Sequence, residues 1–185
     1  VSKTTAGADT FVLPAADGTV GQLMKTDGAG QLGWATDTGG LFSGYAIFAD
    51  QKAQNTQGGT FTSGAWRQRD LNTTIANTDT TNITLGTNDF TLLAGNYFIQ
   101  WSFGAHGVYQ NQTQLHDGTI TIAIGICNYA GNTTPATGET RVTPSTSTTY
   151  QIQHRCASTK ASDGLGVAAN YQTEQYATVL IFKEA

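Results

Sequence analysis

The sequence predicts an all-β protein whose main part is a two-sheet sandwich of jelly-roll type. Charged residues make up only 12% of the 185 residues, and 22 residues are glycine. The hydrophobic fraction of 38% is high enough to build a core. Apolar and polar residues alternate in short runs bounded by turn residues, a pattern typical of strands, and no long helical repeat interrupts them. About eight main runs after residue 41 match the strand number of a jelly roll.

Composition divides the chain into a segment of residues 1–41 and a domain of residues 42–185. The segment is rich in Gly, Asp and Thr, and its few large apolar residues, such as Phe11 and Trp34, cannot form a core alone. We expect it to pack against copies of itself or against the following domain. Asp17-Gly18 and Asp27-Gly28 predict tight turns, and residues 37–40 predict a flexible junction.

The strands of the domain are predicted by period-two alternation, because successive side chains of a strand point to opposite faces. In chain order the predicted ranges are 44–50, 66–71, 89–93, 97–103, 112–116, 119–126, 138–143, 150–156 and 176–183.

Three of these strands carry further expectations. Residues 119–126 alternate isoleucines with smaller residues, as a half-buried strand does. In 150–156, His154 shares the inward parity of its apolar neighbours, which predicts a hydrogen-bonded core or interface histidine. Residues 176–183 are apolar on both faces, so one face suits the core and the other a subunit interface. The interface residues expected on this strand are Tyr176, Thr178, Leu180 and Phe182.

If the strands alternate in direction, the longest loops gather at the end away from both termini. These loops span about residues 51–64, 104–110, 128–137 and 157–174, and loops on a rigid scaffold often carry binding residues. Tyrosine with small polar residues gives contact area at low entropic cost, although each tyrosine could equally pack beneath the loops. The candidate binding residues are His106, Tyr109, Asn128, Tyr129, Asn132, Lys160, Asp163 and Tyr171.

Charge and cysteine content narrow the function further. Nine basic against thirteen acidic residues give a net charge of −4, which argues against a nucleic-acid partner. No apolar run approaches the roughly 18 residues of a membrane helix, so we expect no membrane insertion. Cys127 and Cys156 are expected to be buried free thiols made in a reducing compartment, although a single bridge is the alternative.

Several stretches together resemble one family of viral proteins. They are Tyr-Ala-Ile-Phe-Ala-Asp-Gln-Lys at 45–52, Gly-Gly-Thr-Phe-Thr-Ser-Gly-Ala-Trp-Arg at 58–67 and Ile-Gln-His-Arg-Cys-Ala at 152–157. With them, residues 42–185 resemble the C-terminal jelly-roll domain at the tip of tailed-bacteriophage fibres, which is related to the complement-type globular head and the tumour necrosis factor fold. Residues 13–34 resemble the shaft repeat that often precedes such tips.

The resemblance implies a homotrimer in the virion tail fibre, made in the host cytoplasm and attached to an upstream fibre shaft. Its distal loops would bind a bacterial cell-surface receptor, either a glycan or an outer-membrane protein. The alternative is a structural trimerisation or capping module of the fibre that does not contact the receptor.

Catalytic, cofactor and metal patterns are weak. Two Gly-x-Gly-x-x-Gly-like runs, at 28–33 and 164–169, lack the strand before and helix after that a nucleotide site needs. The three histidines are far apart and show no zinc-ligand spacing, although one on a threefold axis could bind an ion from three chains. Glycan cleavage needs two carboxylates across a groove; Asp163 and Glu174 could both lie near the distal end, but two acids in loops are usually only solvated. We therefore expect no cofactor and no metal, and a binding protein rather than an enzyme.

Overall fold

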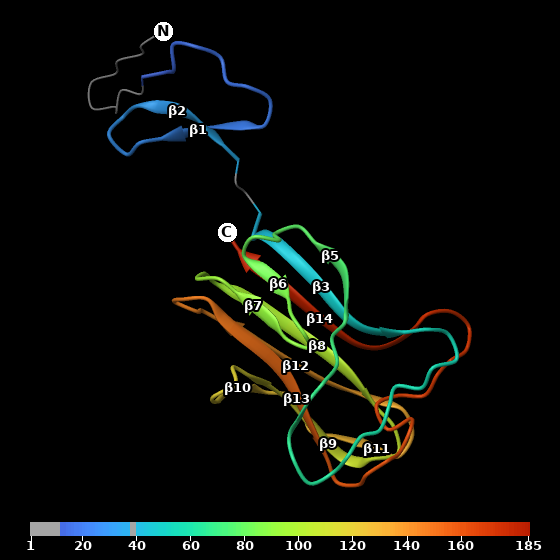
Figure 1. Ribbon diagram of the computed structural model, residues 1–185. Coiled ribbons are helices and arrows are strands. Elements are labelled where there is room, and N and C mark those ends of the chain that lie inside the picture. The colour runs from blue at the N-terminus through green and yellow to red at the C-terminus, as the bar shows by residue number, and fades with distance from the viewer. Residues whose placement is uncertain (1–11, 38–39) are drawn as a thin grey trace. The chain divides into compact units, whose positions relative to one another are not determined.

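The computed structural model describes residues 12–37 and 40–185, and the chain divides into two compact units, residues 1–40 and 41–185 (Figure 1). Phe11 and the residues Thr38 and Gly39 of the predicted junction lie outside the described residues. In the described part the secondary structure consists of strands joined by turns and loops, without a helix.

The first unit contains a hairpin of β1 (Gln22–Thr26) and β2 (Leu32–Thr36). Its turn forms because Asp27 Oδ1 accepts the backbone N–H groups of Ala29, at 2.7 Å, and Gln31, at 3.0 Å. These bonds hold the pKa of Asp27 below its usual value. The Trp34 indole Nε1 donates to the carbonyl of Ala16 at 2.7 Å, so the ring fixes the preceding chain rather than filling a core.

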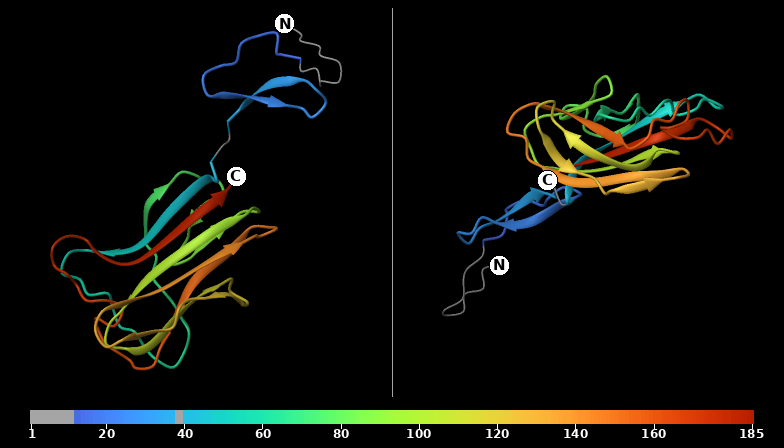
Figure 2. Two further views of the ribbon diagram at one scale, coloured as in Figure 1. Left: turned by 180° about the vertical axis from the view of Figure 1, so that it is seen from behind. Right: turned by 90° about the horizontal axis from the view of Figure 1, so that it is seen from below.

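The second unit is a sandwich of a five-stranded sheet, in the order β12-β8-β14-β3-β5, and a seven-stranded sheet. The seven-stranded sheet has the order β10-β9-β13-β7-β6, with β11 paired to β9 and β4 paired to β13. In the left view of Figure 2, β3 (cyan), β14 (red) and β8 (green) run side by side in the five-stranded sheet. The bounds are β3 (Phe42–Lys52), β4 (Arg67–Gln68), β5 (Thr73–Asn77), β6 (Ile83–Leu85), β7 (Phe90–Leu92), β8 (Tyr97–Ala105), β9 (Tyr109–His116), β10 (Thr121–Ile124), β11 (Asn128–Ala130), β12 (Thr134–Val142), β13 (Thr148–Cys156) and β14 (Glu174–Glu184).

The core lies between the two sheets and follows the period-two pattern. Every second residue of β8 is buried, as the alternation in residues 97–103 leads us to expect of a strand, and the inward row is Tyr97, Ile99, Trp101 and Phe103. Across the core lie inward residues of the seven-stranded sheet, among them Leu115 of β9 and Ile152 of β13. Burial at about 25 cal/mol per Å² of apolar surface makes this layer the main source of stability.

Strand β14 has a core face and an outer face. Val179 and Ile181 are fully buried in the core, whereas Thr178, Leu180 and Phe182 are half-buried on the opposite face. A bulge between Gln175 and Ala177 interrupts the alternation there. Tyr176 lies in this bulge, is only 7% exposed, and donates its hydroxyl to the carbonyl of Thr56 at 2.6 Å.

Residues 119–126 form a shorter strand than predicted, and their isoleucines face outward. Only Thr121–Ile124 form β10, and the isoleucine side chains are 36% to 69% exposed. Ala123 packs against the core instead, and Gly125 is buried. The isoleucines on this outward row are Ile120, Ile122, Ile124 and Ile126.

Small residues on the inward side explain why the isoleucines face outward. A Cβ on Gly125 would meet the hydroxyl of Thr113, and a Cβ on Gly138 would meet the indole of Trp101. The chain at Gly125 therefore approaches the five-stranded sheet more closely than isoleucine would permit. Two backbone bonds hold it there, from Gly125 N–H to Thr113 and from Ile126 N–H to Thr137, both at 2.8 Å.

The two cysteines are free thiols with different environments. Cys156 is buried, as the sequence predicts, and burial raises the pKa of its thiol. Cys127 is exposed, so the expectation of a buried thiol is wrong at that position. It follows the exposed Ile126 at the point where the chain leaves β10 for β11.

Candidate functional site

The loops between the long strands gather at one end of the sandwich, away from Leu41 and Ala185, which we call the distal end (Figure 1). The antiparallel register fixes this arrangement, because β3, β8 and β13 end there and β9, β12 and β14 begin there. The loops at the distal end are 53–66, 106–108, 131–133 and 157–173. The turns after β7, β9 and β12 lie at the opposite end.

Two of the candidate tyrosines form an exposed aromatic pair. The rings of Tyr109 and Tyr129 lie 5.7 Å apart between centroids, and the residues are 47% and 58% exposed. Strands β9 and β11 hold them together, with Gln110 opposite Tyr129 and Tyr109 opposite Ala130. Tyr109 has φ 61°, a left-handed conformation that costs about 1–2 kcal/mol in a residue other than glycine. Such strain is concentrated at binding sites.

Asn128 holds the backbone next to this tyrosine pair. Its Nδ2 donates to the carbonyl of Pro135, and its Oδ1 accepts the backbone N–H of Tyr129, both at 2.8 Å. Both ends of the amide are therefore engaged in holding the start of β11. This places Asn128 among the residues that position the tyrosines.

His106, Lys160 and Asp163 form a second, polar cluster. His106 Nε2 lies 3.8 Å from Asp163 Oδ2, and Lys160 Nζ lies 3.7 Å from Asp163 Oδ1. His106 Nδ1 is also 3.1 Å from the hydroxyl of Thr133, which joins loops 106–108 and 131–133. The cluster ties three distal loops to one another and leaves Lys160 partly exposed.

Asn132 and Tyr171 stand apart from both groups. Asn132 is exposed at the tip of loop 131–133. Tyr171 is 86% exposed in loop 157–173. Both are available at the distal end, but among the described residues no hydrogen bond, ion pair or ring contact joins them to the tyrosine pair or to the polar cluster.

A buried network beneath the distal loops includes residues that the sequence analysis did not single out. The His154 Nε2 donates to Asn111 Oδ1 at 3.0 Å, and its Nδ1 accepts from Arg69 Nη1 at 2.7 Å. His154 is fully buried, as its parity predicts, and its ring packs against Phe61 with the centroids 4.5 Å apart and the planes tilted by 57°. Burial, followed by the Arg69 cation, lowers the pKa of His154 well below its ordinary value. The imidazole is therefore neutral, with its proton on Nε2.

Arg69 links this network to the loops. Its guanidinium donates to the carbonyls of Gly104, at 3.0 Å, and Leu165, at 3.4 Å. It lies over the Phe103 ring at 5.1 Å. Full burial lowers its pKa to about 10. Nothing in the sequence around Arg69 indicates that its side chain is buried. Its contacts with the distal loops could therefore not be predicted.

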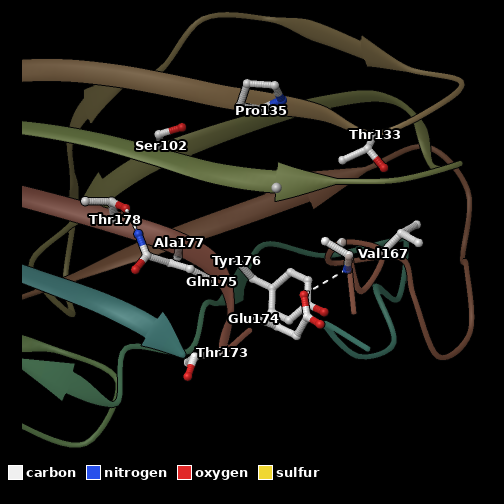
Figure 3. A pocket seen from close by; sticks show the side chains of 13 residues that line it. Ser102, Thr133, Pro135, Val167, Thr173, Glu174, Gln175, Tyr176, Ala177 and Thr178 are labelled. Atoms are coloured by element: carbon white, nitrogen blue, oxygen red, sulfur yellow. Dashed lines mark hydrogen bonds between the residues drawn. The ribbon is translucent and has the colours of Figure 1, made fainter. Parts of the chain in front are cut away.

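A pocket of about 360 Å³ opens where β8, β12 and β14 meet loop 157–173 (Figure 3). Figure 3 shows Tyr176 and Glu174 on one side, with Pro135 and Thr133 across from them. Glu174 accepts the backbone N–H groups of Ala169 and Asn170, both at 2.8 Å. These bonds, led by the one from Ala169, lower the pKa of Glu174. Glu174 thus fastens the C-terminal part of loop 157–173.

A larger groove of about 570 Å³ lies over β9, β11 and β13. Loop 53–66 supplies one wall, and the strands supply the floor. We call it the Trp66 groove; its lining includes Ser63, Trp66, Gln110, Gln112, Cys127 and Arg155. The sequence analysis did not single out this set, because its members come from four separate segments.

The described residues contain neither a candidate metal-binding cluster nor a candidate membrane-spanning helix. In residues 12–37 and 40–185, no group of three or more His, Cys, Asp or Glu side chains is placed to hold a metal ion. Over the same ranges, no helix has the length and apolar character needed to cross a membrane.

Comparisons with known proteins bear on the fold. No protein-family model matches the chain, and no curated protein matches its sequence. The PRD1 vertex protein P5 is similar over 79% of this chain and 100% of its own, with a TM-score of 0.51 and 12% identity. The globular domain of zebrafish complement 1qA covers 74% of this chain and 95% of its own (TM-score 0.46, 13% identity). Murine APRIL at pH 5.0 covers 76% and 98% (TM-score 0.49, 6% identity).

Identities this low show the fold alone. The strand order, the two-layer core and the likeness to the vertex protein agree with the predicted architecture. The chain has an all-β jelly-roll fold.

Proposed function

We propose that the chain is the distal part of a bacteriophage tail fibre, and that its jelly-roll domain attaches the virion to the bacterial surface. The observation that carries this proposal is the exposed Tyr109–Tyr129 pair at the distal end, opposite the end at which the chain enters the sandwich at Leu41. A virion location is compatible with the likeness to the PRD1 vertex protein. The receptor is a surface glycan or an outer-membrane protein, and the role is binding, without a catalytic step.

The proposal includes a homotrimer, which two separate apolar surfaces of the domain support. One is the ridge of exposed isoleucines at the β10 edge of the seven-stranded sheet. The other is the outer face of the five-stranded sheet. There Phe182 lies opposite Tyr45 on one side and Phe98 on the other, next to Leu180 and Ile47. We call these surfaces the isoleucine ridge and the sheet face.

Two different surfaces pair head to tail, and such contacts close into a ring when the rotation permits. Exposed apolar edges otherwise cause aggregation. The ridge of one copy against the sheet face of the next removes both surfaces from water. Thr178, Leu180 and Phe182 belong to this face, whereas the Tyr176 hydroxyl is engaged within its own chain.

Cell binding tests the attachment. We expect the fluorescently labelled protein to bind cells of particular bacterial strains, measured by flow cytometry across a strain panel. Replacing both rings, by Tyr109→Asn with Tyr129→Ala, should lower this binding at least about tenfold, since aromatic contacts dominate binding energies. Arg141→Gln, at an exposed ion pair with Glu184, is the matched control. Undiminished binding by a folded double variant would contradict the tyrosine site.

The structural alternative predicts a different result. A capping module would be trimeric and would bind no strain, while its removal from the virion would destabilise the fibre. Wild-type protein that binds none of the strains, including the host from which the virion is grown, would favour this alternative.

A further inference from the structure

We propose that the Trp66 groove binds a carboxylate-bearing sugar, and hence that the receptor is an acidic surface polysaccharide. This inference rests on the proposed attachment function and names the ligand class. The groove lies on the outward face of β9, β11 and β13, on the same face as Tyr129, which stands opposite the groove residue Gln110.

The shape of the groove suits a short saccharide. Its volume of about 570 Å³ falls within the range of about 300–1,000 Å³ that small-molecule sites occupy. Gln112 and Arg155 stand opposite each other on paired strands and form the floor. A floor built on strands holds its side chains more precisely than loops do.

The charge of the groove selects an anion. Arg155 is exposed and forms no ion pair with any described residue, and no acidic side chain lines the groove. The unpaired guanidinium group of Arg155, on a chain of net charge −4, is suited to an isolated carboxylate, which arginine binds with two parallel hydrogen bonds.

The remaining lining suits the rest of a sugar ring. Gln112, which lines the groove, donates its Nε2 to the carbonyl of Gly125 at 2.9 Å, and this bond fixes the amide. Gln110 is exposed, and its side chain makes no hydrogen bond among the described residues. Amides both donate and accept, as sugar hydroxyls require. The half-buried Trp66 ring gives a flat apolar wall for the C–H face of a pyranose.

The small number of cationic side chains at the groove argues against a polyanionic ligand. Nucleic acids and polyphosphates need many neutralising contacts, whereas a single guanidinium group, that of Arg155, lines this groove. A phosphorylated sugar shares the anionic chemistry, and the experiment below separates it from a carboxylate.

The chain has three tryptophans, so the indole N–H signals of ¹⁵N-labelled protein give a direct probe. Trp34 and Trp101 donate to Ala16 and Thr113, respectively, and Trp66→Phe identifies the third signal. The titrants are glucuronate, galacturonate and N-acetylneuraminate, with glucose, galactose and glucose 6-phosphate for comparison. We expect at least one acidic sugar to shift the Trp66 signal. Its affinity, obtained from the titration, should exceed that of the corresponding neutral sugar at least about tenfold.

Two variants test the role of the arginine. Arg155→Gln should abolish the shift with the acid, whereas Arg141→Gln, an exposed arginine paired with Glu184, should preserve it. Three outcomes would overturn the proposal: no acid moves the Trp66 signal, neutral sugars or the phosphate move it as strongly, or Arg155→Gln keeps the shift.

Cell binding separates this inference from the proposed function. Cell binding that survives Arg155→Gln and Trp66→Ala, and that free acidic sugars do not compete, leaves attachment intact and removes the groove as its site. If the groove binds acidic sugars but the protein binds no strain, host cells included, the attachment function and the receptor assignment are both wrong. The assignment of acidic sugars as ligands of the groove then still holds.

Discussion

Arg69 Nη1 lies 2.7 Å from His154 Nδ1, and this buried bond joins the segment before β5 to the end of β13. A permanent cation can share this contact only with a neutral imidazole that presents a lone pair at Nδ1. The distal loops depend on the pair, because the same guanidinium group binds the carbonyls of Gly104 and Leu165. The network therefore couples the protonation state of one core histidine to the distal end.

The neutral state of His154 makes stability depend on pH. The pKa of His154 is lowered in the folded protein, so below about pH 6.5 the unfolded chain binds a proton that the folded chain does not. This contribution to stability is complete above about pH 6.5 and is lost as the pH falls toward the folded pKa. We expect the free energy of unfolding of wild type to fall by up to about 1.4 kcal/mol per pH unit from this group.

Denaturant unfolding of wild type and His154→Gln between pH 5 and 7.5 measures this effect. The variant should be less stable at pH 7.5 by about 1–3 kcal/mol, as expected for a broken buried hydrogen-bond network. The difference between the two proteins should shrink as the pH falls below 6.5. Gln151→Ala, on the opposite face of β13, removes no titratable group and should keep the wild-type slope. Parallel curves for wild type and His154→Gln would show that His154 is not neutral in the fold.

Gly125 tests the packing that turns the isoleucines outward. A Cβ at this position would lie 2.6 Å from the carbonyl oxygen of Thr137 and would also meet Thr113. Gly125→Ala should therefore destabilise the domain by about 1–3 kcal/mol, the usual cost of overpacking, measured as a lower urea midpoint at constant slope. Gly33→Ala has open space around it and should leave the midpoint unchanged. A wild-type midpoint for Gly125→Ala would contradict the close approach of residues 121–126 to the five-stranded sheet.

Alternation predicts which residues share a strand face, but it does not say which face is inward. For 97–103 the large residues face the core, because the other row contains the polar residues Gln100 and Ser102. For 119–126 the small residues face inward, since the neighbouring backbone at Thr137 and the ring of Trp101 fill the space. The sequence contains both rows, and only the tertiary neighbours decide between them.

The site was predictable to a similar extent. Strand directions bring the predicted loops to one end, and His154 is buried as its parity indicates. The pairing of Tyr109 with Tyr129 depends on a β9–β11 register across nineteen residues of intervening chain, and the sequence around Arg69 shows no pattern of burial. Contacts that depend on register or on single side chains need the folded structure.

The proposed trimer predicts a change in mass for one substitution on the sheet face. Three copies of the 19.5 kDa chain give about 58 kDa in a closed ring. Leu180→Glu places a charge in the middle of the half-buried outer row of β14, and an unpaired charge is costly to bury. Light scattering should therefore show about 58 kDa for wild type and 19.5 kDa for the variant. Thr84→Glu, exposed on β6, should remain trimeric. A monomeric wild type would refute the trimer.

Tyr109 predicts opposite effects of one substitution on stability and on binding. Its left-handed φ of 61° costs a tyrosine about 1–2 kcal/mol, and asparagine tolerates this conformation better. Tyr109→Asn should thus leave the free energy of unfolding unchanged or raise it by up to about 1 kcal/mol, because the ring is 47% exposed and little packing is lost. Cell binding should fall, since the Tyr129 ring loses its partner at 5.7 Å. Tyr171→Asn, at an exposed tyrosine outside the pair, is the comparison. A variant that loses stability and binding together would indicate that Tyr109 holds the fold rather than the receptor.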